Sequence, residues 1–138
     1  MIKLHLETFE ESWQSRHSWE LDAIAYLIGR SKVCDISLDL TPVLGSRLSK
    51  IHCCLFRRSD SAKDKYGKYL PPGYDLVDGF KGKPSSNGTY LNQLDANIVN
   101  RIFLRNGDVI YLSDRVRFIY TDCRPSATSE LEDTLIDP

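Results

Sequence analysis

The pattern that most constrains the fold is a series of short segments in which apolar and polar residues alternate. In IKLHLETF (2–9) and DISLDL (35–40), isoleucine and leucine recur at every second position. A period of two residues is typical of a β-strand with one buried face, and no stretch of ten residues has a clean helical period. Turn residues such as Asn106-Gly107 separate the segments. The chain is therefore predicted to be all-β, a sandwich or a barrel.

The 138 residues are predicted to form one folded domain followed by a short tail. Strand-like segments continue to RFIYTD (117–122), so we place the domain at residues 1–123. The remainder, residues 124–138, contains SATSELEDTLIDP, which is acidic, lacks alternation and ends in proline. This composition is typical of a flexible tail.

Composition and charge argue against several classes of function. Apolar residues make up 41% of the chain and charged residues 27%, and the formal net charge is −1. Such a composition is typical of soluble globular proteins. The small net charge creates no overall electrostatic field that would attract the protein to nucleic acid or to a membrane. The longest apolar run, AIAYLI (23–28), is too short to span a bilayer, and the N-terminus does not look like a signal peptide. We expect a cytoplasmic protein, or a nuclear one in a eukaryote, that binds neither nucleic acid nor membrane.

Basic and hydroxyl-bearing residues gather where predicted strands meet loops, in GRS (29–31), SRLSKIH (46–52) and SSNGT (85–89). Asn-Gly alone is a common hairpin turn, but loops at one end of a sandwich cluster together. If these loops meet, they bring together several polar side chains, none of which is a carboxylate. These are the side chains of Arg30, Arg47, Ser49, Lys50, Asn87 and either Ser85 or Ser86. Guanidinium, ammonium and hydroxyl donors together suit a phosphate dianion.

Catalytic and metal chemistry have little support in the sequence. Paired carboxylates and a nucleophile with a neighbouring base are both lacking near these loops. The four cysteines, Cys34, Cys53, Cys54 and Cys123, lack metal-ligand spacing, so buried free thiols are expected. We predict no catalytic residue, no metal site and no cofactor.

The order of the motifs resembles that of a forkhead-associated (FHA) domain, a phosphothreonine-binding module. The resemblance is carried by Gly29-Arg30, Ser49-Lys50-Ile51-His52, Ser85-Ser86-Asn87-Gly88-Thr89 and the segment LRNGDVI (104–110). It implies a β-sandwich of about eleven strands with its ligand loops at one end. It also implies a non-enzymatic role in signalling, in which the domain docks proteins that carry phosphothreonine.

The resemblance further assigns roles by position. The positions that bind the phosphate correspond to Arg30, Ser49, Lys50 and Ser86. Asn87 falls where the family bonds the peptide backbone, and Arg47 falls where it reads residues after the phosphothreonine. The structural positions correspond to Gly29, His52, Gly88 and Thr89, and His52 braces the loops from behind. The connection DGFKGKPSSNG (78–88) is longer than usual, so the choice between Ser85 and Ser86 stays open.

Two further questions stay open at the level of the sequence. The chain could be a degenerate FHA sandwich that makes phosphate-independent protein contacts, since its insertions alter the peptide-selecting loop. In the tail, Thr128 has Leu131 and Thr134 has Asp137 three positions on, the position that FHA domains tend to read. A phosphorylated tail would then be a ligand for its own domain or a neighbour's, whereas the alternative is an ordinary linker or chain end.

Overall fold

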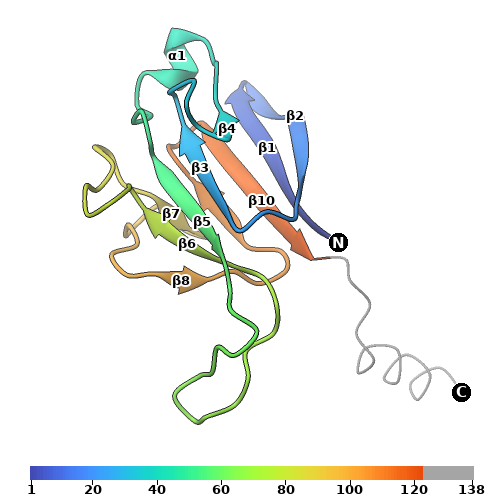
Figure 1. Cartoon of the computed structure of the whole chain (residues 1–138). Helices are drawn as coiled ribbons and strands as arrows, with labels where there is room; N and C mark the ends of the chain where they lie inside the picture. The colour runs from blue at the N-terminus through green and yellow to red at the C-terminus, as the bar shows by residue number, and fades with distance from the viewer. Residues whose placement is uncertain (123–138) are drawn as a thin grey trace, which may run out of the picture.

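The computed structural model describes residues 1–122 as a sandwich of two five-stranded sheets (Figure 1). In spatial order, the first sheet contains β2 (Ser12–Leu21), β1 (Ile2–Glu10), β10 (Val116–Asp122), β9 (Val109–Tyr111) and β7 (Tyr90–Leu91). The second sheet contains β4 (Ile36–Ser37), β3 (Ala25–Gly29), β5 (Cys53–Arg57), β6 (Tyr74–Asp78) and β8 (Ile102–Phe103). Neighbouring strands are antiparallel except β3 and β4. The predicted all-β sandwich is confirmed, with ten strands in the described residues rather than about eleven.

The alternating segment at the N-terminus forms β1 and builds one wall of the core. Ile2, Leu4 and Leu6 are buried, while the side chains between them are more exposed. On the neighbouring strand β10, Tyr120 lies opposite Leu4 and Phe118 lies opposite Leu6. Full burial of an apolar side chain of this kind contributes about 1.5–3 kcal/mol. The inward face of β1 therefore accounts for the position of this strand.

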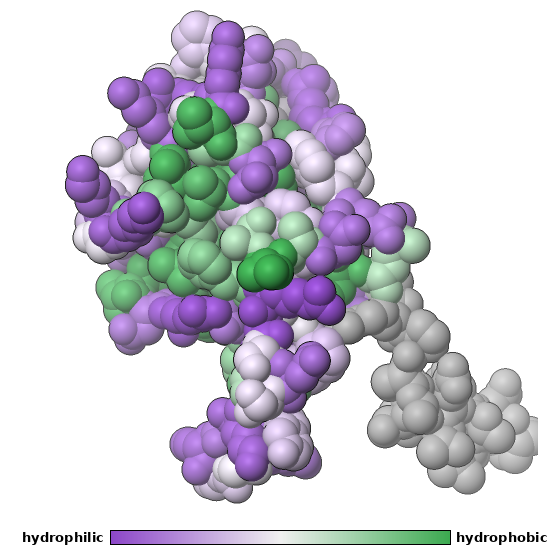
Figure 2. Space-filling model, in the orientation of Figure 1, coloured by the Kyte–Doolittle hydropathy of each residue, from purple (hydrophilic) through white to green (hydrophobic). Residues whose placement is uncertain are grey.

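The central strand β5 connects the two ends of the sandwich. It begins directly after His52 and ends at Arg57, from where residues 58–73 project away from the sheets (Figure 1). Leu55 faces the core, whereas Phe56 lies on the outer face of the second sheet. Hydrophobic residues gather over that outer face, along β3, β5 and β6 (Figure 2).

Two adjacent arginines at the end of β5, Arg57 and Arg58, have different surroundings. Arg57 is exposed, but only 5% of Arg58 is exposed. The Arg58 guanidinium donates to Asp75 Oδ1 at 3.1 Å and to the Tyr74 carbonyl at 3.1 Å, and it lies over the Phe103 ring. These acceptors compensate for the loss of water around the charge. Arg57 is therefore a solvated residue at the strand end, whereas Arg58 is a buried and paired one.

The helical content of residues 1–122 is small. It consists of α1 (Pro42–Gly45), which lies before the loop that holds the second polar motif. Within these residues, no helix is long and apolar enough to cross a membrane. The predicted domain boundary at residue 123 and the predicted tail, residues 124–138, lie outside the part of the chain that the structure describes.

Candidate functional site

Three loops meet at the end of the sandwich that carries α1. The Arg30 N–H donates to the Ser49 carbonyl at 3.1 Å, and the Ser31 N–H donates to the Lys50 carbonyl at 3.0 Å. The Ser86 N–H donates to Ser49 Oγ at 2.9 Å. Residues 29–31, 46–51 and 85–88 are therefore brought together, and none of the three segments contains a carboxylate.

Arg30 stands at the point where β3 ends. Its Nε donates to the Leu48 carbonyl at 2.9 Å, which fixes the side chain, while the residue as a whole stays exposed. The terminal guanidinium nitrogens carry further N–H donors for a ligand. At the preceding residue, Gly29, an added Cβ would lie 2.2 Å from the Lys50 carbonyl oxygen. Only glycine allows the first two loops to approach this closely.

His52 connects the second loop to the third from beneath. The side chain is fully buried; its Nδ1 accepts the Ser49 N–H at 3.1 Å, and its Nε2 lies 2.8 Å from the Gly88 carbonyl oxygen. A backbone N–H can only donate and a carbonyl can only accept, so the ring is neutral with its proton on Nε2. Burial lowers the pKa of His52, which favours the same neutral state.

The two serines of the third loop have different surroundings. Ser85 is buried: its hydroxyl donates to Asp78 Oδ1 at 2.6 Å and accepts the Gly88 N–H at 2.9 Å. Ser86 is exposed beside Ser49. The Ser85 hydroxyl is thus occupied inside the loop, whereas Ser86 is exposed to solvent.

Asp78 organises this loop, and sequence reasoning missed it. Its carboxylate accepts the hydroxyls of Ser85 and Thr89, the latter at 2.5 Å, and the Ser85 N–H at 3.2 Å. Gly88 follows with a φ of +87°, a conformation that glycine adopts without strain. A carboxylate at the end of a predicted strand, shortly before a run of hydroxyl residues, was the available signal.

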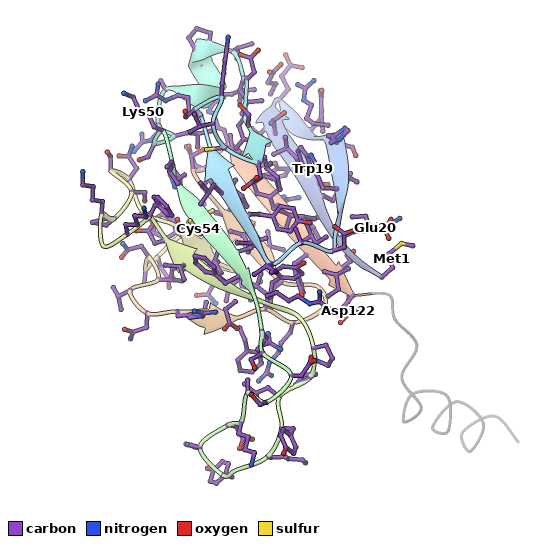
Figure 3. The ribbon with its side chains drawn as sticks, viewed as in Figure 1. Met1, Trp19, Glu20, Lys50, Cys54 and Asp122 are labelled. Carbon is purple, nitrogen blue, oxygen red and sulfur yellow. The ribbon has the colours of Figure 1, made fainter. Side chains whose placement is uncertain are left out.

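The remaining polar side chains of the site are exposed at its rim. Lys50, labelled in Figure 3, lies at the end of the molecule that carries α1. Asn87 Nδ2 donates to the Arg47 carbonyl at 2.8 Å, which holds the third loop against the second. The Tyr90 hydroxyl donates to the Asn87 carbonyl at 3.0 Å. The rim therefore presents two cationic side chains, of Arg47 and Lys50, and one carboxamide.

A pocket of about 230 Å³ opens beside these rim residues. It is lined by Arg47, Asn87, Tyr90, Leu94, Ser113 and Asp114. One cation, one carboxylate and the Leu94 side chain thus share a depression next to the polar loops.

Metal and thiol chemistry have no visible basis in residues 1–122. No group of three or more His, Cys, Asp or Glu side chains in this range could hold a metal ion. Cys34, Cys53 and Cys54 are buried free thiols. Burial raises the pKa of Cys53 well above its usual value and that of Cys54 to about 11, so neither forms a thiolate readily. Cys123 lies outside the described residues.

Known proteins share this architecture. In solved structures, the chain resembles the Slr1951 protein from Synechocystis sp. (25% identity, TM-score 0.65, covering 90% of this chain and 100% of that one). It also resembles full-length yeast Pml1p (25% identity, TM-score 0.63, covering 88% and 81%). A third similar structure is Mycobacterium tuberculosis EmbR in complex with a low-affinity phosphopeptide (22% identity, TM-score 0.56, covering 90% and 25%).

At the level of sequence, no curated protein matches the chain. A family model described as FHA domain matches residues 26–113, which is more than half of the chain. The matched range contains the three polar loops and the strands that carry them. The chain therefore belongs to the forkhead-associated (FHA) family, whose members are phosphopeptide-binding modules.

Proposed function

We propose that this domain is a non-enzymatic module that binds phosphothreonine in partner proteins. The observation that carries the proposal is the convergence of exposed cationic and hydroxyl groups on three loops whose segments lack a carboxylate. A phosphothreonine carries about −1.5 to −2 charges at neutral pH. Each hydrogen bond to such a charged group contributes about 1.5–3 kcal/mol. Two or three bonds would therefore support micromolar binding, about −8 kcal/mol.

Each residue has a distinct role in this proposal. The groups that hold the phosphate are the side chains of Arg30, Ser49, Lys50 and Ser86. Ser86 takes the hydroxyl position rather than Ser85, because the Ser85 hydroxyl is occupied by Asp78 and by the Gly88 N–H. Asn87 holds the peptide backbone. Arg47 and the adjoining pocket read the residues that follow the phosphothreonine.

Membership of the FHA family supports a phosphorylated protein as the partner. EmbR, one of the similar structures, is in complex with a phosphopeptide. Another is described as part of an analysis of phosphothreonine-dependent FHA domain interactions. Neither nucleic acid nor membrane is expected as a partner, and the role is docking in signalling. The tail threonines Thr128 and Thr134, one of which would make the tail a ligand for its own domain or a neighbour's if it were phosphorylated, lie outside the described residues.

The proposal is tested with a phosphothreonine peptide library, the matching unphosphorylated peptides and the matching phosphoserine peptides. Fluorescence anisotropy measures binding to the full chain, to Arg30→Ala and to the control Arg57→Ala, an exposed arginine at the other end of β5. We expect micromolar binding of phosphothreonine peptides only, loss of binding in Arg30→Ala, and no change in Arg57→Ala.

Two outcomes would contradict the proposal in different ways. Equal binding of phosphorylated and unphosphorylated peptides, unchanged in Arg30→Ala, would instead favour the degenerate sandwich with phosphate-independent contacts. Release of inorganic phosphate from the peptides would show an enzyme. Raising the ionic strength provides an additional check. The affinity for phosphopeptides should fall, because salt screens the attraction between the phosphate and exposed cations.

A further inference from the structure

The connection between β5 and β6 is a second surface, distant from the phosphate loops. β5 begins beside His52 and ends at Arg57, so residues 58–73 lie at the opposite end of the sandwich. Figure 1 shows this connection projecting from the sheets, and in Figure 2 it forms a separate lobe. Two large side chains on it face solvent: Tyr66 is 82% exposed and Tyr69 is 65% exposed.

The connection is held in shape by its own hydrogen bonds. Asp64 Oδ1 accepts the backbone N–H of Tyr66 at 2.8 Å and that of Lys68 at 3.0 Å. The two arms are joined by the Leu70 N–H, which donates to the Ala62 carbonyl at 2.9 Å. The side chains of the lobe are therefore presented by a formed turn.

Between this lobe and β8 lies an open groove of about 660 Å³. Its walls are mainly aromatic and aliphatic, formed by Tyr66, Tyr69, Leu70, Pro71 and Phe103. Its cationic lining comes from Lys65, Lys68 and Arg105. The one carboxylate in the lining, that of Asp64, accepts the two backbone N–H groups of the turn. The groove thus combines exposed aromatic surface with a net positive charge.

We propose that the acidic C-terminal segment of the same chain, residues 126–138, docks in this groove. The strand that precedes this segment, β10, ends close to the groove. The Asp122 N–H donates to Asn106 Oδ1 at 2.9 Å, and the Gly107 N–H donates to the Tyr120 carbonyl at 2.8 Å. The end of β10 is thereby fixed to the turn that directly follows Arg105. β10 therefore ends near Arg105, which belongs to the cationic lining of the groove.

The segment and the groove are chemically complementary. The segment contains four carboxylates, Glu130, Glu132, Asp133 and Asp137, and no basic residue. Leucine and isoleucine at 131, 135 and 136 lie between them. Carboxylates that face Lys65, Lys68 and Arg105 gain from opposite charge, while the aliphatic side chains are buried against the tyrosines.

A short connection tethers the acidic segment to the domain. Seven residues, 123–129, separate β10 from the first carboxylate and span at most about 25 Å when extended. A tether of this length produces an effective concentration in the millimolar range. A contact with only millimolar intrinsic affinity is then populated. The inference does not depend on phosphothreonine binding, because the groove and the phosphate loops lie at opposite ends of β5.

The proposal is tested by amide NMR spectra of the full chain. Charge reversal in the tail (Glu130→Lys, Glu132→Lys and Asp133→Lys together) should shift the amide signals of residues 64–70 and 103–105. A second variant, Tyr66→Ala with Tyr69→Ala, should release the tail, so the amide signals of residues 130–136 should move to the positions they have in the free peptide of residues 126–138. The control Lys32→Glu, an exposed lysine at the other end of the sandwich, should leave both sets of signals unchanged.

A synthetic peptide of residues 126–138 supplies the same contact in trans. It should bind the tail-reversed full chain, shift the same groove amides, and bind at least about fivefold more weakly to a tail-reversed chain that also carries the two tyrosine substitutions. Unchanged groove signals after tail reversal would overturn the proposal, as would shifts confined to the outer face of β3, β5 and β6. Light scattering that shows a dimer held by the same contact would also overturn it, because the segment would then dock on a second copy.

Discussion

Replacement of His52 by leucine tests whether this buried side chain supports the loops of the site without itself binding the ligand. Leucine fills much of the same buried space but can neither accept the Ser49 N–H nor donate to the Gly88 carbonyl. Each buried backbone group left without a partner costs about 1–3 kcal/mol. The substitution should therefore lower the free energy of unfolding by about 2–6 kcal/mol, a large part of the 5–15 kcal/mol typical of a domain.

Urea unfolding of His52→Leu, followed by tryptophan fluorescence, measures this loss directly. The control is His17→Leu, which replaces an exposed histidine on β2 and should change stability by less than about 0.5 kcal/mol. His52→Gln should recover part of the loss, because a carboxamide offers one acceptor and two donors. Phosphothreonine peptide affinity should fall in His52→Leu even where the domain is folded, since the second and third loops lose their common support.

The reasoning would be refuted if His52→Leu unfolded at the same urea concentration as His17→Leu. It would also be refuted if stability fell while the affinity of the remaining folded protein stayed at the wild-type value. The first result would mean that the two hydrogen bonds contribute nothing net. The second would mean that the loops keep their geometry without His52.

Three further predictions follow from the same end of the molecule. Gly29→Ala should destabilise the domain by about 1–3 kcal/mol and weaken peptide binding, because the new Cβ meets the Lys50 carbonyl; thermal unfolding and anisotropy measure the two effects. Ser85→Ala should cost about 1–3 kcal/mol of stability, whereas Ser86→Ala should leave stability unchanged and lower affinity about tenfold or more. If Ser86→Ala lowered stability and Ser85→Ala lowered affinity, then Ser85 would be the residue that contacts the phosphate. Because the pKa of His52 is lowered in the folded state, unfolding takes up a proton, so the stability of the free domain should fall as the pH drops below about 6.5. The limiting slope of this fall is about 1.4 kcal/mol per pH unit. Urea titrations between pH 7.5 and 5.5 should show a slope that His52→Gln removes.

Much of the fold could be predicted because the alternation of β1 reports directly which side chains are buried. The motif residues Arg30, Ser49 and Asn87 could be located because each stands where the alternation breaks into a loop. Strands of two residues, such as β4 and β8, are too short to show an alternating pattern in the sequence. The number of strands is therefore less well determined by the sequence than the class of the fold.

The sequence could not show which polar side chains are buried by distant partners. Arg57 and Arg58 are identical in type and adjacent, yet only Arg58 reaches Asp75, seventeen positions away. Ser85 and Ser86 present the same problem. Their difference depends on the Asp78 carboxylate, which turns one hydroxyl inward. In both cases a side chain from β6, the strand paired with β5, decides the outcome.

The same dependence explains how residues on loops can be held in a fixed geometry. The ligand residues of the proposed site are on loops, but the groups that brace them stand at strand ends. His52 precedes β5 and Asp78 ends β6, and these two strands pair directly, with Cys53 opposite Asp78. Ser49, Ser85, Gly88 and Thr89 are thus bonded to side chains carried by the central strands of one sheet. The loops are already ordered in the folded domain, so binding does not have to order them again. A few exposed donors would therefore suffice for a small charged ligand.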